Sequence, residues 1–254
     1  MNYEEKILKR VKEHYNHICK FYNKDQILGV FLYGSQNYNL ATENSDVDTK
    51  AIYIPTLREL LFDKPISKEI QIPDSEEHCE VKDIREIIKN FKKQNINFIE
   101  LLFTNYFILN EKYAELWHQY FITARENIAR YDVQQGIHSM SHQALHTLRQ
   151  AVNGDDTAKK IANTMRLLYF LERYIRGEPY IQCLVPTDDA HKIMLKTKTS
   201  KYLGDVYFFA YEILRTSLRG YAYGDYKFLV DEEKKKWLDN YMEEAILKLV
   251  NLNF

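Results

Sequence analysis

Residues 31–54 read FLYGSQNYNLATENSDVDTKAIYI and contain two apolar segments separated by a polar stretch. The first apolar segment covers residues 27–33 and ends at Gly34-Ser35, and the second covers residues 47–54. Short apolar and aromatic runs that are bounded by glycine and polar residues are typical of buried strands. The stretch therefore predicts two strands joined by a polar connection that begins with glycine and serine.

Two acidic residues, Asp46 and Asp48, lie at the start of the second predicted strand. Because side chains alternate along a strand, both carboxylates are expected on one face of the sheet. Paired carboxylates suit Mg²⁺, or Mn²⁺ in its place, when substrate phosphates complete the metal shell. Two such ions can hold the attacking and leaving oxygens of an in-line nucleotidyl transfer.

The polar connection has features of a phosphate-binding turn. Gly34 lacks a Cβ, so the backbone at Gly34 and Ser35 can approach a triphosphate closely. If residues 36–40 begin a short helix, its free N–H groups face the same phosphates. A glycine–serine pair alone is ordinary turn chemistry, and two aspartates on a strand edge are usually solvated, so the combination carries the prediction.

This combination resembles the signature of the DNA polymerase β-like nucleotidyltransferase superfamily, which is GS, a variable spacer and DxD. The matching residues are GS at 34–35 and SDVD at 45–48. The resemblance implies metal-dependent transfer of a nucleoside monophosphate from an NTP to a hydroxyl acceptor. An RNA end, a protein and a small molecule all remain open as the acceptor, because nothing in the sequence selects among them.

Two later segments resemble a bacterial and phage group of predicted nucleotidyltransferases. They are residues 84–103, which end in NINFIELLF, and residues 159–168, KKIANTMRLL. The chain departs from that group at Asn97, where proline is common, and at Asn163, where histidine is common. The second departure puts in question any role of that position as a base or phosphate ligand.

A third carboxylate usually joins the pair in the superfamily and can act as general base. Glu80, in the predicted strand 78–81, is our candidate for this catalytic and metal-binding position, because the apolar Cys79 and Val81 occupy the opposite face. Asp83 is the alternative, but it precedes a predicted helix and is better interpreted as its N-cap. Glu100 lies in an apolar run and is either a group near the site or a buried, hydrogen-bonded carboxylate.

Cations are also needed to offset the triphosphate charge. Lys159 and Arg166 lie seven residues apart and share one face of a predicted helix, which can either bind phosphate or be an ordinary solvated face. Lys50 shares the strand face of Asp48 and either contacts phosphate or flanks the strand. We therefore predict nucleotide binding by Gly34, Ser35 and these three cations.

Composition excludes several other classes of protein. Among 254 residues, 35 Lys and Arg nearly balance 36 Asp and Glu, so no net positive field indicates general affinity for nucleic acid or membranes. The three cysteines are widely spaced, which fits reduced thiols. The N-terminal residues 3–22 form an amphipathic helical pattern rather than a signal peptide, and no run approaches the ~20 apolar residues of a membrane span. These features predict a soluble cytoplasmic protein without a membrane partner.

One histidine pattern suggests a transition metal less strongly. His138, His142 and His146 recur every four residues, a spacing that can chelate zinc. They lack the glutamate of an HExxH motif, and the apolar residues between them are typical of a helix that packs on a core.

The predicted fold class is α+β. Strands are expected at 27–33, 47–54, 69–72 and 78–81, and helices dominate from residue 83 onward. We predict a mixed-sheet nucleotidyltransferase domain over 1–108 and a helical domain over 109–254 that closes the nucleotide cleft. A nucleotide-binding regulator without turnover, or a toxin–antitoxin partner protein, is the alternative function. The sequence does not predict the oligomeric state.

Overall fold

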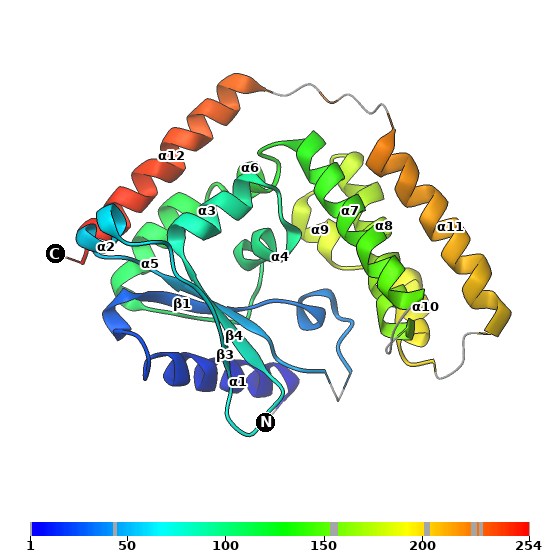
Figure 1. Ribbon diagram of the computed structural model, residues 1–254, viewed down its shortest axis with the longest axis horizontal. Helices are drawn as coiled ribbons and strands as arrows, with labels where there is room; N and C mark the ends of the chain where they lie inside the picture. Colours follow the sequence, from blue (N-terminus) through cyan, green and yellow to red (C-terminus); the bar gives the residue numbers. More distant parts are fainter. Residues whose placement is uncertain are drawn as a thin grey trace.

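The computed structural model describes residues 2–42, 45–152, 157–200, 204–224, 228 and 231–253, of which 152 and 204–210 are described only as backbone. The described chain is α+β, with a five-stranded sheet in the order β3-β4-β2-β1-β5. Helices cover the sheet and form a separate bundle to one side of it (Figure 1).

The sheet is mixed. Strand β1 (Ile27–Leu32) pairs antiparallel with both β2 (Thr49–Tyr53) and β5 (Phe107–Leu109). Strand β4 (His78–Asp83) runs parallel to β2 and antiparallel to β3 (Ser67–Gln71). All six residues of β1 are buried, as its apolar sequence predicts for a central strand. The sequence predicted all of these strands except β5, whose three residues are too few to show a period.

Helix α1 (Tyr3–Ile18) covers one face of the sheet. Its apolar side packs with β1 and β2 in a hydrophobic cluster that includes Val11, Val30 and Ala51. Asn2 caps the helix, and Glu5 completes a capping box. The faces of β2 are thereby fixed: Ala51 and Tyr53 belong to the cluster under α1, whereas Ile52 belongs to the hydrophobic cluster of the opposite face.

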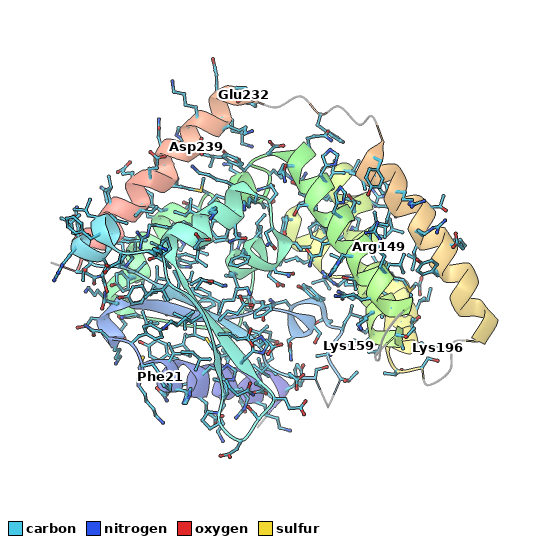
Figure 2. The ribbon with its side chains drawn as sticks, in the orientation of Figure 1. Phe21, Arg149, Lys159, Lys196, Glu232 and Asp239 are labelled. Carbon is cyan, nitrogen blue, oxygen red and sulfur yellow. The ribbon has the colours of Figure 1, made fainter. Side chains whose placement is uncertain are left out.

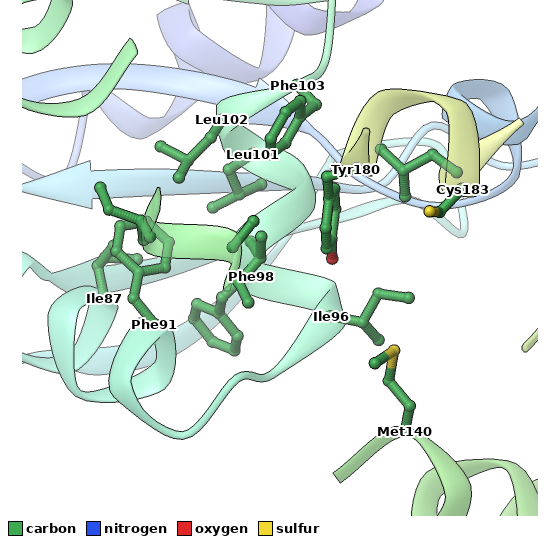
Figure 3. Close-up of a cluster of buried hydrophobic side chains, with 14 of the residues drawn as sticks. Ile87, Phe91, Ile96, Phe98, Leu101, Leu102, Phe103, Met140, Tyr180 and Cys183 are labelled. Atoms are coloured by element: carbon green, nitrogen blue, oxygen red, sulfur yellow. The ribbon is translucent and has the colours of Figure 1, made fainter. Parts of the chain in front are cut away.

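Shorter helices cover that opposite face. They are α3 (Ile84–Lys92), α4 (Ile96–Ile99), the 3₁₀ turn Glu100–Leu102, α5 (Glu111–Trp117), the π-helical turn His118–Ile122 and α6 (Arg125–Ala129). Figure 3 shows the apolar side chains of α3 and α4 meeting Leu101 and Leu102. Asp83 caps α3 by accepting a hydrogen bond from the Arg85 N–H, which confirms its interpretation as an N-cap.

The remaining helices form the bundle and one returning segment. Helices α7 (Val133–Val152), α8 (Thr157–Ile175), α9 (Tyr180–Leu184), α10 (Asp188–Lys198) and α11 (Gly204–Tyr223) pack on one another. Helix α12 (Glu232–Asn251) returns to α3 and α5, near α2 (Leu57–Phe62) (Figure 1). The predicted boundary after residue 108 falls inside β5, and a single hydrophobic cluster extends across it. Among the described helices, none has the length and apolar character needed to cross a bilayer.

Candidate active site

The turn after β1 has a backbone conformation that favours glycine. Gly34 has φ 103° and ψ −153°, a region that residues with a side chain rarely adopt. Ser35 then begins a 3₁₀ turn, Ser35–Tyr38, which ends at Asn39 in the left-handed conformation. The Tyr33 N–H donates to the Asp48 carbonyl over 3.1 Å, so this turn lies beside the start of β2.

The two predicted carboxylates lie on the residues just before β2 and both line a cleft beside the turn. The side-chain amide of Gln36 donates to the Asp46 carbonyl over 2.6 Å and fixes the backbone there. The Asp48 carboxylate lies 3.1 Å from Nδ1 of His78 and 3.4 Å from the His78 N–H. Burial raises the pKa of Asp48, and His78 opposes that shift. Both carboxylates therefore lie at the cleft beside the glycine turn.

The cleft has a volume of about 430 Å³ and two walls of opposite charge. One wall holds the turn, Asp46, Asp48 and Glu100, and the other holds side chains of α7, α8 and α10. The basic residues of the second wall are Lys159, Lys160, Arg166 and Lys198. Lys159 lies near the beginning of α8 (Figure 2).

Arg166 is buried at this wall, with an exposure of 3%. Its Nε donates to Oδ1 of Asn163 over 3.0 Å, and its guanidinium lies 3.9 Å from the centroid of the Tyr38 ring. Its Nη1 is buried and has no hydrogen-bond partner among the described residues. Asn163 stands where the bacterial and phage group commonly has histidine, and it orients Arg166 so that the Nη1 donor remains available to a ligand.

Lys198 joins the second wall to the segment that precedes the carboxylates. Its ammonium donates to the Leu40 carbonyl over 2.6 Å and lies 3.4 Å from the Ser45 hydroxyl. Burial lowers the pKa of Lys198, and the positive charge of Lys159 lowers it further. Sequence reasoning missed Lys198, because only the packing of α10 on α8 brings it to the cleft.

Glu100 is both a residue of the cleft and a buried, hydrogen-bonded carboxylate, which are the two interpretations that the sequence left open. It is fully buried and lines the cleft. Its Oε2 accepts hydrogen bonds from the Tyr38 hydroxyl, from the Gly34 N–H over 3.5 Å and from the Asn37 amide over 3.4 Å. Burial raises its pKa, while the Tyr38 hydrogen bond and the charge of Arg166 oppose the rise. Through these hydrogen bonds the Glu100 carboxylate fixes the turn that begins at Gly34.

Lys50 and Glu80 pair with each other and do not line the cleft. Their residues are register partners on β2 and β4, and Lys50 Nζ lies 2.7 Å from Glu80 Oε1. The ammonium also lies 3.7 Å from the centroid of the Tyr33 ring. Burial lowers the pKa of Lys50; burial alone would raise the pKa of Glu80, but Lys50 and Lys82 hold it below its usual range.

The pair is linked to the cleft through one hydroxyl. The Tyr33 OH lies 3.1 Å from Glu80 Oε1 and 3.2 Å from Nε2 of His78, whose other ring nitrogen contacts Asp48. Glu80 thus contributes to the placement of Asp48 through Tyr33 and His78. Its predicted role as a metal ligand, and that of Lys50 as a phosphate contact, stay predictions.

The donor set can be compared with the needs of a divalent cation. Within the described residues, no group of three His, Cys, Asp or Glu side chains is arranged to hold a metal ion. Asp46 and Asp48 supply hard oxygens at the cleft, and Mg²⁺ is commonly bound by one or two carboxylates together with substrate phosphates. These two carboxylates would therefore need oxygen atoms from a bound ligand to complete the shell of such an ion.

Comparisons with known proteins find a weak structural likeness and no sequence match. No protein-family model and no curated protein matches the chain. A solved structure described as a nucleotidyltransferase-like protein from Exiguobacterium sibiricum 255-15 aligns with a TM-score of 0.33 and 12% sequence identity. The alignment covers 96% of this chain and 91% of that one. At this TM-score the likeness carries no functional conclusion, so the function proposed below depends on the cleft itself.

Proposed function

We propose that the protein is a nucleotidyltransferase that transfers a nucleoside monophosphate from an NTP to a hydroxyl acceptor. One observation carries the proposal: Asp46 and Asp48 line the same cleft as four basic side chains, with a glycine turn between the strand and the carboxylates. A nucleoside triphosphate with divalent metal needs this distribution, since carboxylates hold the metal and cations offset the remaining phosphate charge.

Each part of the cleft has a role in the proposed reaction. The backbone at Gly34 and Ser35 binds phosphate oxygens, while Arg166 and Lys159 offset their charge from the opposite wall. Lys160 and Lys198 add to this positive potential at the same wall. Glu100 holds the turn beneath the phosphates through its hydrogen bonds to Gly34, Asn37 and Tyr38. With the triphosphate bound in this way, an acceptor hydroxyl would form a bond to the α-phosphorus and lose its proton, while the bond from that phosphorus to the departing pyrophosphate breaks.

Mg²⁺ or Mn²⁺, bound by Asp46 and Asp48, would supply the positive charge that stabilises the transferring phosphoryl group. Asp48 is oriented for this role by His78, which in turn contacts the Tyr33 hydroxyl. Glu80 is a further proposed ligand, and its ion pair with Lys50 would then have to open. The acceptor is proposed only as a hydroxyl of RNA, protein or a small molecule.

The test is nucleotide transfer from each α-labelled NTP with Mg²⁺ or Mn²⁺, using total RNA, tRNA and cell-extract protein as acceptors. We expect label transfer by the wild type and its loss in Asp46→Asn and Asp48→Asn, because an amide keeps the shape but lacks the charge that binds metal. Circular dichroism and melting temperature should show that both variants remain folded. Full transfer by either variant would contradict the assigned site.

A further inference from the structure

Two buried polar atoms at the cleft have no hydrogen-bond partner among the described residues. They are Glu100 Oε1 and Arg166 Nη1, and both residues line the cleft. Each belongs to a side chain that is at most 3% exposed. Tyr38 lies between the two side chains, because its hydroxyl donates to Glu100 Oε2 and its ring centroid lies 3.9 Å from the Arg166 guanidinium. Buried polar atoms are normally paired, so such a group points to a ligand.

Neighbouring residues fix both side chains and leave one polar atom of each without a hydrogen-bond partner. Tyr38, Gly34 and Asn37 all donate to Glu100 Oε2, which leaves Oε1 free on the same carboxylate. Asn163 accepts a hydrogen bond from Arg166 Nε, and the Tyr38 ring contacts the Arg166 guanidinium, while Nη1 has no partner.

The charges of this group select the chemistry of the ligand. Glu100 repels a phosphate oxygen, and Arg166 repels an ammonium group or a metal ion. Oε1 can accept a hydrogen bond and Nη1 can donate one, so the matching group is neutral and does both. A hydroxyl has this character.

The position of the group indicates which hydroxyl it is. Glu100 bonds the N–H of Gly34, so Oε1 belongs to the carboxylate directly beneath the proposed phosphate turn. Arg166 shares its wall with Lys159, a proposed phosphate contact. The sugar is the part of a nucleotide that is joined to the phosphates. We propose that Glu100 and Arg166 form a subsite for a ribose hydroxyl of the donor, so that the enzyme selects ribonucleoside over deoxyribonucleoside triphosphates.

This inference rests on the proposed function, and calorimetry can separate the two. The four NTPs and their 2′-deoxy and 3′-deoxy forms are titrated into the full chain with Mg²⁺ and without acceptor. A lost hydrogen bond to a charged group should weaken binding of one deoxy series ~10- to 100-fold for every base. Binding of no nucleotide would overturn the proposed function and this subsite with it. Equal affinity for ribo and deoxy forms, or selection by base alone, would overturn the subsite and leave nucleotide binding intact.

A charge-neutral substitution then tests the residue itself. Glu100→Gln should lower the ribo-to-deoxy ratio, because the hydrogen bond to an ionised acceptor becomes a weaker neutral one. The matched control is Glu115→Gln, an exposed glutamate of α5 outside the cleft, which should leave the ratio unchanged. A ratio in Glu100→Gln equal to that of the wild type, with the fold intact by circular dichroism, would overturn the assignment.

Discussion

Replacing Gly34 with alanine should destabilise the protein by about 1–3 kcal/mol, the usual cost of holding a residue in a sparsely populated backbone conformation. The structure separates this cost from steric collision. A Cβ built on Gly34 meets no other atom within 4 Å, whereas its φ of 103° disfavours any side chain. The loss would therefore come from the backbone alone. A turn that shifts to relieve it should also bind phosphate less well.

Gly220→Ala is the matched control. Gly220 also has no atom within 4 Å of a built Cβ, but it lies within α11 and its φ is not positive. Alanine there should stabilise the protein by about 0.4–1 kcal/mol, because it restricts the unfolded chain at a position that tolerates it. The same chemical change is thus expected to have opposite signs at the two glycines.

A second control tests the link to function. Gly177 follows α8 and has φ 79°, again with no atom within 4 Å of a built Cβ. Gly177→Ala should lower stability but leave affinity for Mg²⁺–NTP unchanged, whereas Gly34→Ala should lower both. Urea denaturation gives the free energies of unfolding by linear extrapolation, and calorimetry gives the affinities. Unchanged stability of Gly34→Ala, or shifts of equal sign at Gly34 and Gly220, would refute the reasoning.

Three further predictions concern the charges of the cleft. Arg166→Ala should weaken NTP binding by about 1.5–3 kcal/mol in calorimetry, whereas Arg215→Ala on α11 should not. If the wild type and both variants bind NTP with equal affinity, Arg166 serves the fold or the acceptor and does not bind the NTP. An NTP together with Mg²⁺ should raise the melting temperature more than either alone, and at a ligand concentration of 100 times Kd the free energy of unfolding should rise by about 2.7 kcal/mol. If no NTP gives a metal-dependent shift of the melting temperature, the result would count against the site. Glu100 has a raised folded-state pKa, so its contribution to stability is lost as pH rises through that pKa. Glu100→Gln should therefore gain stability relative to the wild type as the pH rises above about 4.5 in urea denaturation, and parallel curves would contradict this.

The strands and most long helices were predictable because each carries its own periodic pattern. Strand β1 is one continuous apolar run, and α1 has an apolar side separated by charges. Strand β5 was missed, and the five-residue helices α6 and α9 have no pattern of their own, since three to five residues show no period. Their conformations come from the elements they pack against.

The two walls of the cleft differed in how far the sequence predicts them. The carboxylate wall is local in sequence, because Asp46 and Asp48 lie within fifteen residues of Gly34, just before β2. The basic wall combines α8 with α10, so Lys198 carries no local signal. Lys50 has the spacing of a site residue, yet the sequence could not show that Glu80 is its register partner and would pair with it.

The groups that would bind phosphate also hold the two walls together. Arg166 stacks on Tyr38, and Lys198 donates to the Leu40 carbonyl, so both basic side chains contact the segment between the glycine turn and the carboxylates. A triphosphate can use the remaining donors of Arg166 without breaking its contacts, because a guanidinium has five N–H groups. Lys198 would have to exchange the carbonyl for a phosphate oxygen. Binding of nucleotide is therefore expected to leave the Arg166 contact in place and to loosen the Lys198 contact, which couples occupation of the cleft to the position of α10.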